Sequence, residues 1–411
     1  MEVKPGYKQT EVGGIPEEWE VIPLSKTAKR ITRGASPRPI DSPVWFDPRS
    51  SVGWVRISDV TRSGRYLLET TQRLSDAGIR SSRPVPSGSL IMSICATVGR
   101  PIETLINTCI HDGFVVFDQP TINQSFLYHT LTGLEPKWYK HGQTGSQMNL
   151  NTGLINGCLI PLPPDPEQRA IATALSDVDG LLGGLDRLIT KKRDLKQATM
   201  QELLTGRTRL PGFRGEWEVK RLKTIVQTPV TDGPHLTPQF YEDGIPFLSV
   251  NNLVGNRIDL TDLRFISQQD HELFSRKCKP RKDDILLGKA ASVGKVAIVE
   301  LDYEFNIWSP IALIRISSDH VPRFIYYQLQ SVDLMGQVIL LTNSSSQGNI
   351  GMGDIEKLIL KLPSHAEQTA IAEVLTEMDG ELAVLEQRRE KTRALKQAMM
   401  QELLTGRTRL V

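Results

Sequence analysis

The sequence contains no long apolar run. Its 411 residues are 39% hydrophobic and 23% charged, which are ordinary values for a globular protein of two or three domains. No stretch of about 18 consecutive apolar residues occurs, so we expect no membrane-spanning helix. The opening residues, MEVKPGYKQTEVGGIPEEWE, lack the apolar core of a signal peptide, and a cytoplasmic location is therefore expected.

Cysteine is scarce in this chain. The four cysteines stand singly at Cys95, Cys109, Cys158 and Cys278, with no CxxC pair and no histidine at a metal-ligand spacing. Scattered cysteines of this kind are typical of reduced thiols, and zinc sites need closely spaced ligands. We therefore expect neither disulfides nor a bound metal.

Motifs of catalysis are also missing. The sequence has no GxGxxG after an expected strand and no Walker A loop. The segment Pro163–Asp165 (PPD) lacks the leading Asn or Asp and the aromatic residue of the amino-methyltransferase motif. A nuclease-like Glu218-x-Lys220 has no matching lysine in the other half of the chain, where Glu20-x-Ile22 stands. We expect no catalytic residue.

Positive charge is unevenly distributed, although the net charge is only +2. Residues 25–100 contain thirteen Lys and Arg against five Asp and Glu. Segregated positive charge is typical of a surface that binds a polyanion such as DNA. A solvated surface in which arginine serves solubility is the alternative, and charge alone does not decide between them.

An internal repeat organises the whole chain. The phrase LKQATMQELLTGRTRL at 195–210 returns as LKQAMMQELLTGRTRL at 395–410, and EQRAIATALSDVDG at 167–180 returns as EQTAIAEVLTEMDG at 367–380. Residues 33–82 and 231–276 hold corresponding places but match poorly. A shared frame with two different inserts suggests one task performed twice, with the inserts reading two different targets.

The best-matching part of each half predicts a long helix. Apolar residues follow the 4-3 spacing of a heptad seam. Glycine after the last apolar pair, at Gly206 and Gly406, is a common helix stop. Two such helices would bury their seams on each other, antiparallel if the halves are related by a pseudo-twofold. Gly183 and Gly184 predict a soft point or a close approach. The expected packing residues are Ile171, Leu175, Val178, Leu182, Leu185, Ile371, Leu375, Met378, Leu382 and Leu385.

The rest of each half alternates short apolar runs with turn residues, which predicts mixed α/β structure. Expected strands include 54–60 and 245–250, then 89–94, 113–117, 284–288, 295–299 and 311–316. The fold class is therefore α+β, with two tandem mixed α/β domains separated by two long helices that pack as an antiparallel coiled coil with pseudo-twofold symmetry.

Polar loops at corresponding places suit DNA contacts. Arginine pairs with guanine, Asn and Gln pair with adenine, and Ser or Thr bind bases or phosphates. Turn chemistry alone is the other interpretation of each single residue. The candidate DNA-binding residues of the first half are Arg33, Ser36, Arg38, Arg56, Ser58, Thr97, Arg100, Gln143, Thr144, Ser146, Gln147 and Asn149. Those of the second half are Thr231, His235, Thr237, Asn251, Asn252, Lys289, Ser292, Lys295, Asn343, Ser345, Ser346, Gln347 and Asn349.

The complete chain resembles the specificity subunit of type I restriction–modification systems. The resemblance rests on the tandem halves, on helices that open with EQxAIA and close with QELLTGRTRL, and on a WxVxxL segment at the start of each half. The run before each helix, from GSQMN to PLP in the first half and from SSQGN to KLP in the second, also matches, as does DGPHLTP in the second half. The order of these motifs, duplicated at fixed spacing, is highly specific.

The resemblance implies a division of labour. Residues 1–164 and 207–363 would be target recognition domains, each reading half of a bipartite site in double-stranded DNA. Residues 165–206 and 364–411 would be spacer helices that set the distance between half-sites and dock two methyltransferase subunits. Restriction subunits would join that core. S-adenosylmethionine, ATP and Mg²⁺ would belong to these partners, which methylate adenine N6, and this chain would bind no cofactor.

Two other functions are compatible with the residues. The first is a non-catalytic scaffold that holds proteins and contacts DNA only incidentally. The second is an enzyme that acts without partners. A steep loss of DNA affinity with salt distinguishes DNA binding from the scaffold, and incubation of the isolated chain with labelled S-adenosylmethionine would reveal the enzyme.

Overall fold

The computed structural model describes residues 5–141, 150–343 and 348–410 and divides the chain into two compact units. Unit 1 is Met1–Leu188 with Leu385–Val411, and unit 2 is Ile189–Val384. Each unit thus contains residues from both sequence repeats. None of the helices in the described residues is long and apolar enough to cross a membrane.

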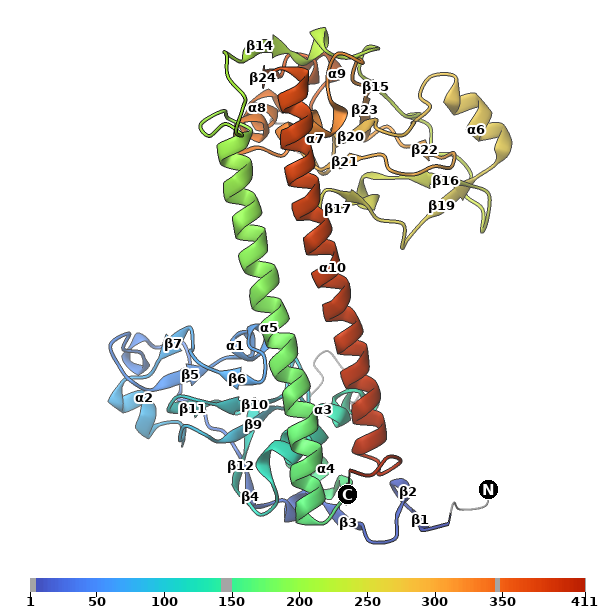
Figure 1. Cartoon of the computed structure of the whole chain (residues 1–411). Helices are drawn as coiled ribbons and strands as arrows, with labels where there is room; N and C mark the ends of the chain where they lie inside the picture. Colours follow the sequence, from blue (N-terminus) through green and yellow to red (C-terminus); the bar gives the residue numbers. More distant parts are fainter. Residues whose placement is uncertain (1–4, 142–149, 344–347, 411) are drawn as a thin grey trace. The chain divides into compact units, whose positions relative to one another are not determined.

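Unit 1 contains β-sheets with both parallel and antiparallel strand pairs, together with several helices (Figure 1). Its strands are β1 (Tyr7–Thr10), β2 (Gly13–Pro16), β3 (Glu20–Pro23), β4 (Ala28–Arg33), β5 (Gly53–Val55), β6 (Tyr66–Leu67), β7 (Gln72–Arg73), β8 (Arg83–Val85), β9 (Leu90–Ser93), β10 (Pro101–Thr104), β11 (Thr108–Ile110), β12 (Phe114–Pro120) and β13 (Leu159–Leu162). Its short helices are η1 (Leu24–Lys26), η2 (Pro43–Trp45), α1 (Ile57–Arg62), α2 (Asp76–Arg80), α3 (Gln124–His141) and α4 (Thr152–Gly157).

Unit 2 repeats this composition. Its strands are β14 (Glu218–Arg221), β15 (Thr231–Asp232), β16 (Ile245–Leu248), β17 (Leu253–Val254), β18 (Arg257–Ile258), β19 (Arg264–Ile266), β20 (Ile285–Gly288), β21 (Val296–Ile298), β22 (Asn306–Ile307), β23 (Ile311–Ile314) and β24 (Ile359–Leu362). Its short helices are η3 (Leu222–Thr224), η4 (Val250–Asn252), α6 (Gln268–Ser275), α7 (Pro322–Leu329), α8 (Val332–Leu341) and α9 (Met352–Ile355).

The two units share the central strand order of both sheets, although among the described residues the sheets of unit 2 have no counterpart of β6 or β8. In unit 1 the main sheet has the order β4-β12-β9-β10-β6, and in unit 2 the corresponding order is β15-β23-β20-β21. A second sheet runs β7-β5-β11-β8 in unit 1 and β19-β16-β22 in unit 2. The central strand pairs β9–β12 and β20–β23 are antiparallel. Their apolar side chains are buried, so these strands form the core of each unit.

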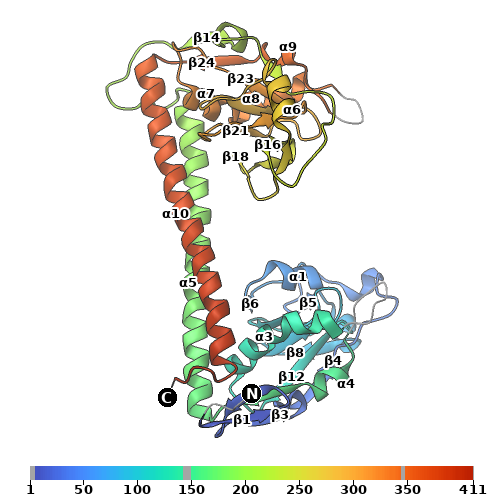
Figure 2. The same cartoon turned by 90° about the vertical axis from the view of Figure 1, so that its right-hand side faces the viewer.

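A helix covers the main sheet in each unit. In unit 1, helix α3 lies against the sheet (Figure 2). Its Leu127 and Leu131 pack with Met92 and Val115 of the sheet. In unit 2, Phe324 of α7 takes the same role in the core. The mixed α/β class predicted from the sequence is confirmed by this arrangement and by the solved structures described below.

Two long helices contribute to both units. Helix α5 (Asp165–Leu203) gives residues up to 188 to unit 1 and the remainder to unit 2, whereas α10 (His365–Leu403) gives residues up to 384 to unit 2 and the remainder to unit 1. Gly206 and Gly406 follow the helices with φ of 72°, the left-handed conformation that glycine adopts without strain. The expected glycine stop is therefore present in both copies.

Ion pairs give the direction of the two helices inside each unit. In unit 1, Asp179 pairs with Lys396 at 2.6 Å, and Asp186 pairs with Arg389 at 3.5 Å. From the first pair to the second, the residue number rises along α5 and falls along α10. The two helices are therefore antiparallel in unit 1. Unit 2 has the corresponding pair Lys196–Asp379, also at 2.6 Å.

The predicted seam residues lie at these helix contacts. Ile171 and Leu175 are buried with Leu403 and Leu404 in unit 1, and Ile371 and Leu375 occupy the same position in unit 2. Leu185 and Leu382 are also buried, whereas Val178, Leu182, Met378 and Leu385 are half-buried. The seam is most deeply buried at the helix ends, where other elements of each unit add their own apolar residues.

The repeated RTRL tails close each unit by reaching the other repeat. Arg409 donates to the buried Glu167 at 2.6 Å and to Glu18 at 2.9 Å in unit 1. Arg209 forms the corresponding pair with buried Glu367 in unit 2. Each arginine comes from one sequence copy and each glutamate from the other. The matching ends of the two repeats are therefore partners of each other.

The glutamine that follows each glutamate fixes the start of its helix. Gln168 donates to the carbonyl of Pro163 at 2.9 Å and accepts from the backbone N–H of Asn123 at 3.0 Å. Gln368 makes the same two bonds with Pro363 and Val321. These bonds satisfy buried backbone groups, which explains why an EQ pair opens both helices.

A buried histidine replaces a tyrosine at one equivalent position. In unit 2, the Tyr327 hydroxyl donates to Asp379 at 2.8 Å. In unit 1, His129 occupies this place beside Ser176 at 3.2 Å, and its Nδ1 lies 3.9 Å from Asp179. Burial, together with the nearby cations Arg65 and Lys396, lowers the pKa of His129 to about 3. The ring is therefore neutral in the folded unit.

Two sequence-based expectations are wrong in detail. Helix α5 runs unbroken through Gly183 and Gly184; a Cβ at Gly183 would meet only the Arg187 side chain at 3.5 Å and one at Gly184 no atom within 4 Å, so the expected close approach is not found and the soft point stays a prediction. The strand expected over 54–60 ends at Val55, because the Asp59 carboxylate accepts from the backbone N–H of Arg56 at 3.0 Å and starts helix α1.

We expect the substitution Leu175→Ala to destabilise the protein by about 2–5 kcal/mol, because it removes a fully buried side chain from the helix seam. Leu181→Ala is the matched control. Its leucine is 44% exposed on the same helix, so its effect should stay within about 0.5 kcal/mol. Urea unfolding measures the free energy of unfolding of both variants. Equal losses of this free energy would contradict the burial of Leu175 in the helix seam.

We expect stability to fall as the pH drops from about 6.5 towards 4.5. The unfolded chain protonates His129 near pH 6.5, while the folded chain cannot, so the unfolded state binds more protons over this range and stability rises with pH. The variant His129→Tyr, which copies the residue of unit 2, should flatten this dependence. Tyr327→His should steepen it. Chemical unfolding across this pH range tests both variants. If the free energy of unfolding depended on pH in the same way for all three proteins, His129 would not be the source of the pH dependence.

Candidate nucleic-acid interface

Three predicted polar segments meet in unit 2, and two of the corresponding segments lie within the described residues of unit 1. We define the early loop as residues 33–39 and 232–238, the strand-end loop as 94–100 and 289–295, and the late loop as 142–149 and 342–349. In unit 2, the backbone of Ile350 donates to the Lys289 carbonyl at 2.9 Å, and Ala290 forms a bridge with Asn349. In unit 1, Leu150 donates to Ile94 at 2.8 Å. The residue that follows the late loop therefore contacts the strand-end loop in both units.

A glycine anchors the early loop in both units. A Cβ on Gly34 would lie 2.1 Å from the carbonyl oxygen of His111, and a Cβ on Gly233 would lie 1.7 Å from that of Ile307. Only glycine allows so close an approach of two backbones. The early loops thus share one backbone attachment although their other residues differ.

In unit 1 the early loop is held by one aspartate. Ser36 donates to the Asp112 carboxylate at 2.6 Å, which is the main cause that lowers the pKa of Asp112. Arg33 donates to the Asp112 backbone carbonyl at 2.6 Å. Arg38 is exposed at the end of the loop. Asp112 was not predicted from the sequence, because nothing marks it apart from the turn in which it lies.

In unit 2 the early loop is built on a buried acid instead. Asp232 is fully buried, with Lys277 at 2.5 Å, Lys289 at 3.0 Å and His235 at 3.4 Å from its carboxylate oxygens. Burial raises the pKa of Asp232, but the two lysines outweigh burial and the net shift is downward. His235 is 71% exposed and its Nδ1 lies 3.0 Å from the Ser309 hydroxyl. The two early loops thus present different chemistry on the same backbone.

The strand-end loops share an unusual conformation. Ala96 and Ala291 stand at corresponding places with φ of 56° and 60°, a region that non-glycine residues rarely adopt. In unit 1, Arg100 donates to the carbonyl of Ser63 at 3.0 Å, and in unit 2, Lys295 donates to that of Val250 at 3.2 Å. The loops are therefore tied to α1 and η4. Backbone strain that recurs in both units is typical of functional loops.

Two predicted residues serve the fold itself. The Asn252 amide donates to the carbonyls of Asp259 and Asp262, and its oxygen accepts from Ser249 N–H. Asn252 is 6% exposed and Lys289 is 8% exposed, with its charge on Asp232. Neither is carried into the DNA surface proposed below.

The other described candidates remain accessible. Ser58, Thr237, Asn251, Asn343 and Asn349 are exposed, while Arg56, Thr97, Thr231 and Ser292 are half-buried. The remaining candidates lie outside the described residues: Gln143, Thr144, Ser146, Gln147, Asn149, Ser345, Ser346 and Gln347.

The basic residues of the segment 25–100 serve two different purposes. Arg65 is buried against Glu103 at 2.7 Å, and Arg62 pairs with Asp59 at 2.7 Å. Other members of the stretch, including Lys29, Arg30 and Arg80, are exposed. Part of the charge excess therefore supports the fold, and the rest is accessible to a polyanion. Among the described residues, no group of three His, Cys, Asp or Glu could hold a metal ion.

We expect Asp232→Asn to destabilise the protein by roughly 3–5 kcal/mol, because it leaves the buried ammonium of Lys289 without its counter-charge. Adding Lys289→Met removes that unpaired charge, and the double variant should recover a large part of the loss. Thermal or urea unfolding of the single and double variants gives the coupling free energy between Asp232 and Lys289. A single variant as stable as the parent protein would show that this acid does not support the loop.

Comparison with known families gives extensive matches. The model of the type I restriction modification DNA specificity domain matches residues 46–191 and 214–393. The putative type I restriction enzyme MjaX specificity subunit of Methanocaldococcus jannaschii is 26% identical over 98% of this chain and 97% of its own length. The EcoBI specificity subunit of Escherichia coli is also 26% identical, over 61% of this chain and 57% of its own length.

Solved structures share the fold. The S subunit of a type I restriction–modification system from M. genitalium superposes with a TM-score of 0.61 at 13% identity, covering 98% of both chains. A chain from a type I R-M system, solved in a study of complex assembly and conformational transition, has a TM-score of 0.55 at 18% identity and covers 96% of this chain and 99% of that chain. Because the family model matches both halves across most of their length, the chain belongs to the type I restriction modification DNA specificity domain family.

Proposed function

We propose that this chain is the DNA recognition subunit of a type I restriction–modification complex. The observation that carries the proposal is that the same central strand order occurs twice while the early loops differ, with Arg33 and Ser36 in one unit and Asp232 and His235 in the other. The names of the matched relatives, all specificity subunits, support it. Each unit would read one half of a bipartite site.

The recognition surface would be formed by the early, strand-end and late loops of each unit, together with neighbouring residues at α1, η4 and the end of α6. Arg38, Arg56 and Arg100 in unit 1 and Lys277 and Lys295 in unit 2 supply positive charge for phosphates. His235, Asn251, Asn343 and Asn349 supply side chains that can read base edges. Because the two early loops differ in charge and hydrogen-bonding groups, the half-sites would differ.

The long helices would form the spacer. In this proposal, residues 1–164 and 207–363 are target recognition domains, and residues 165–206 and 364–411 form an antiparallel coiled coil with pseudo-twofold symmetry. The equivalent ion pairs Asp179–Lys396 and Lys196–Asp379 support this symmetry. The helices would dock two methyltransferase subunits that methylate adenine N6 and, with them, restriction subunits. The chain itself would be non-catalytic.

The spacer is tested by lengthening both helices together. Each unit contains half of each helix, so inserting four residues after Leu188 and four after Val384 leaves the contacts inside both units intact. One added turn extends each helix by roughly 6 Å, which is close to two base pairs at about 3.4 Å each. We expect the assembled enzyme to methylate the same two half-sites across a longer spacer.

Single-molecule sequencing of genomic DNA measures this outcome, with the unmodified chain and its methyltransferase as the control. An insertion in α5 alone is the matched variant, and it should impair assembly because it shifts the ion pairs of the two helices out of register. A changed half-site with an unchanged spacer would contradict the proposal. A methyltransferase that modifies the bipartite site without this chain would do the same.

A protein scaffold without DNA recognition is the alternative function. Neutralising several phosphates makes DNA affinity fall steeply with salt. We expect the assembled complex to lose affinity for its site by at least tenfold between about 50 and 200 mM salt. Affinity that is independent of both salt and sequence would favour the scaffold.

A further inference from the structure

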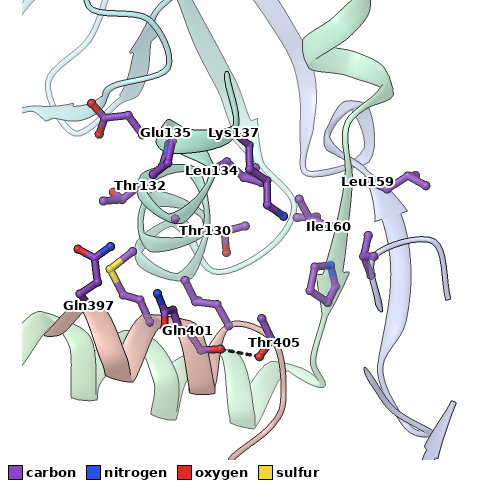
Figure 3. Close-up of a pocket in the computed structure, with 16 residues that line it drawn as sticks. Thr130, Thr132, Leu134, Glu135, Lys137, Leu159, Ile160, Gln397, Gln401 and Thr405 are labelled. Carbon is purple, nitrogen blue, oxygen red and sulfur yellow. Dashed lines mark hydrogen bonds between the residues drawn. The ribbon is translucent and has the colours of Figure 1, made fainter. Parts of the chain in front are cut away.

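Two surface features have no role in the function proposed above. The first is a groove of about 780 Å³ in unit 1, between the end of α10, helix α3 and strand β13 (Figure 3). Its lining mixes apolar, polar and oppositely charged side chains, which does not select one kind of ligand. The second feature is Leu236 in the early loop of unit 2, and its surroundings do select a ligand.

Leu236 is exposed to solvent without packing on the protein. Its exposed fraction is 71%, and it joins none of the apolar clusters that the described residues form. Its neighbours His235 and Thr237 are exposed as well. A single exposed leucine needs no explanation by itself, because much of a protein surface is apolar. The role of this leucine follows from how its loop is held and from the charges beside it.

The chain is held in place on both sides of this leucine. On one side, a Cβ on Gly233 would collide with a neighbouring backbone, and the carbonyl of Pro234 accepts from the Ser309 N–H at 3.2 Å. Nδ1 of His235 lies 3.0 Å from the Ser309 hydroxyl. On the other side, Pro238 is buried. A side chain presented from an anchored loop loses little conformational freedom on binding, which favours affinity.

Positive charge lies at the base of the same loop. The buried Asp232 carboxylate faces Lys277 at 2.5 Å and Lys289 at 3.0 Å, so these three groups carry one excess positive charge. The Lys277 side chain is half exposed and also donates to the Gly233 carbonyl at 3.4 Å. The cores of protein–protein interfaces are depleted of charged residues, whereas the major groove of DNA places methyl groups between anionic phosphates. An exposed leucine beside an accessible cation therefore favours DNA as the ligand.

The early loop of unit 1 offers a different group at the corresponding place. Residues 34–39 and 233–238 both run from the anchoring glycine to a proline without an insertion. In this alignment Leu236 corresponds to Pro37, which is buried, and the next residue of unit 1 is the exposed Arg38. Arginine binds hydrogen-bond acceptors and not methyl groups. A methyl contact by this loop is therefore confined to unit 2.

We propose that Leu236 is a specificity residue that contacts the C5-methyl group of a thymine in the half-site of unit 2, an inference that rests on the proposed function. In the major groove this methyl group distinguishes a T·A pair from a C·G pair, because cytosine has none and presents an amino donor instead. Lys277 binds a neighbouring phosphate, and the anchored loop holds the leucine at the base. The two units thus differ in the chemistry that they read.

The methyl contact is tested with uracil, which pairs as thymine does but lacks the methyl group. Sequencing of methylated genomic DNA first identifies the bipartite site. The full-length chain assembled with its methyltransferase is then titrated with duplexes in which deoxyuridine replaces one thymidine at a time. We expect affinity to fall about fourfold at one thymine of one half-site, which is the effect of removing one buried methyl group.

Variants at the same position connect this loss to the leucine. In Leu236→Ala the thymine and uracil duplexes should bind equally well at that position, whereas Leu236→Met keeps an apolar contact and should keep the ratio. Val254→Ala, at a residue that is 50% exposed in β17 of the same unit, is the matched control and should also keep it. Ratios measured in the other half-site should be the same for all these proteins. Thermal unfolding verifies that each variant is folded.

Four results would overturn the assignment of Leu236. They are a parent complex that is insensitive to uracil at every position, a folded Leu236→Ala variant that keeps the fourfold ratio, a variant that changes both half-sites equally, and affinity that depends on 5-methylcytosine in place of cytosine and not on thymine. Weaker assembly of Leu236→Ala with the methyltransferase at an unchanged ratio would make the residue a protein contact and overturn it too. The absence of any bipartite methylated site would contradict the proposed function itself.

Discussion

The fold of both units depends on a salt bridge that joins the two sequence repeats. Arg409 binds Glu167 and Arg209 binds Glu367, and both glutamates are 1% exposed. A carboxylate buried to this degree requires a charged partner, because an unpaired buried charge is costly. In unit 1 the Trp19 indole adds a hydrogen bond of 2.9 Å to the same carboxylate. The tail of one repeat, the first turn of the opposite helix and the segment around Trp19 are thereby held at one point.

The two units share backbone features but differ in the side chains of their loops. The central strand order, the glycine that anchors the early loop, and the left-handed alanine of the strand-end loop are common to both. The charged groups of the early loops differ between the units. In unit 1 an aspartate accepts from Ser36, whereas in unit 2 a buried aspartate gathers two lysines and a histidine. The backbone fixes where a side chain is presented, and the sequence of the insert decides what it offers.

Much of the frame was predictable from the sequence because repeats and heptads are periodic. Ile171, Leu175, Ile371 and Leu375 recur every three or four residues, and all four are buried as that spacing requires. Local hydrogen bonds were less visible. Nothing in the apolar run after Trp54 indicates that Asp59 would start a helix there, although its short polar side chain is suited to that role.

The candidate site was harder to predict because its key partners are distant in sequence. Lys289 and Asn252 have residue types that suit DNA, yet a buried carboxylate holds one and two backbone carbonyls hold the other. Sequence spacing carries no information about a contact between residues 232 and 289. The same limit hid Asp112 and Lys277, whose roles follow from the loop that lies against them.

The assignment of residues 385–410 to unit 1 has a consequence for biosynthesis. Unit 2 ends at Val384, so all of its residues have been made before the last part of α10 is translated. Unit 1 begins first but lacks Leu403, Leu404 and Arg409 until those residues have been translated. During that interval Ile171 and Leu175 have no α10 partner. The amino-terminal unit is therefore completed last, and a nascent chain truncated before residue 385 would expose an apolar surface of the kind that molecular chaperones bind.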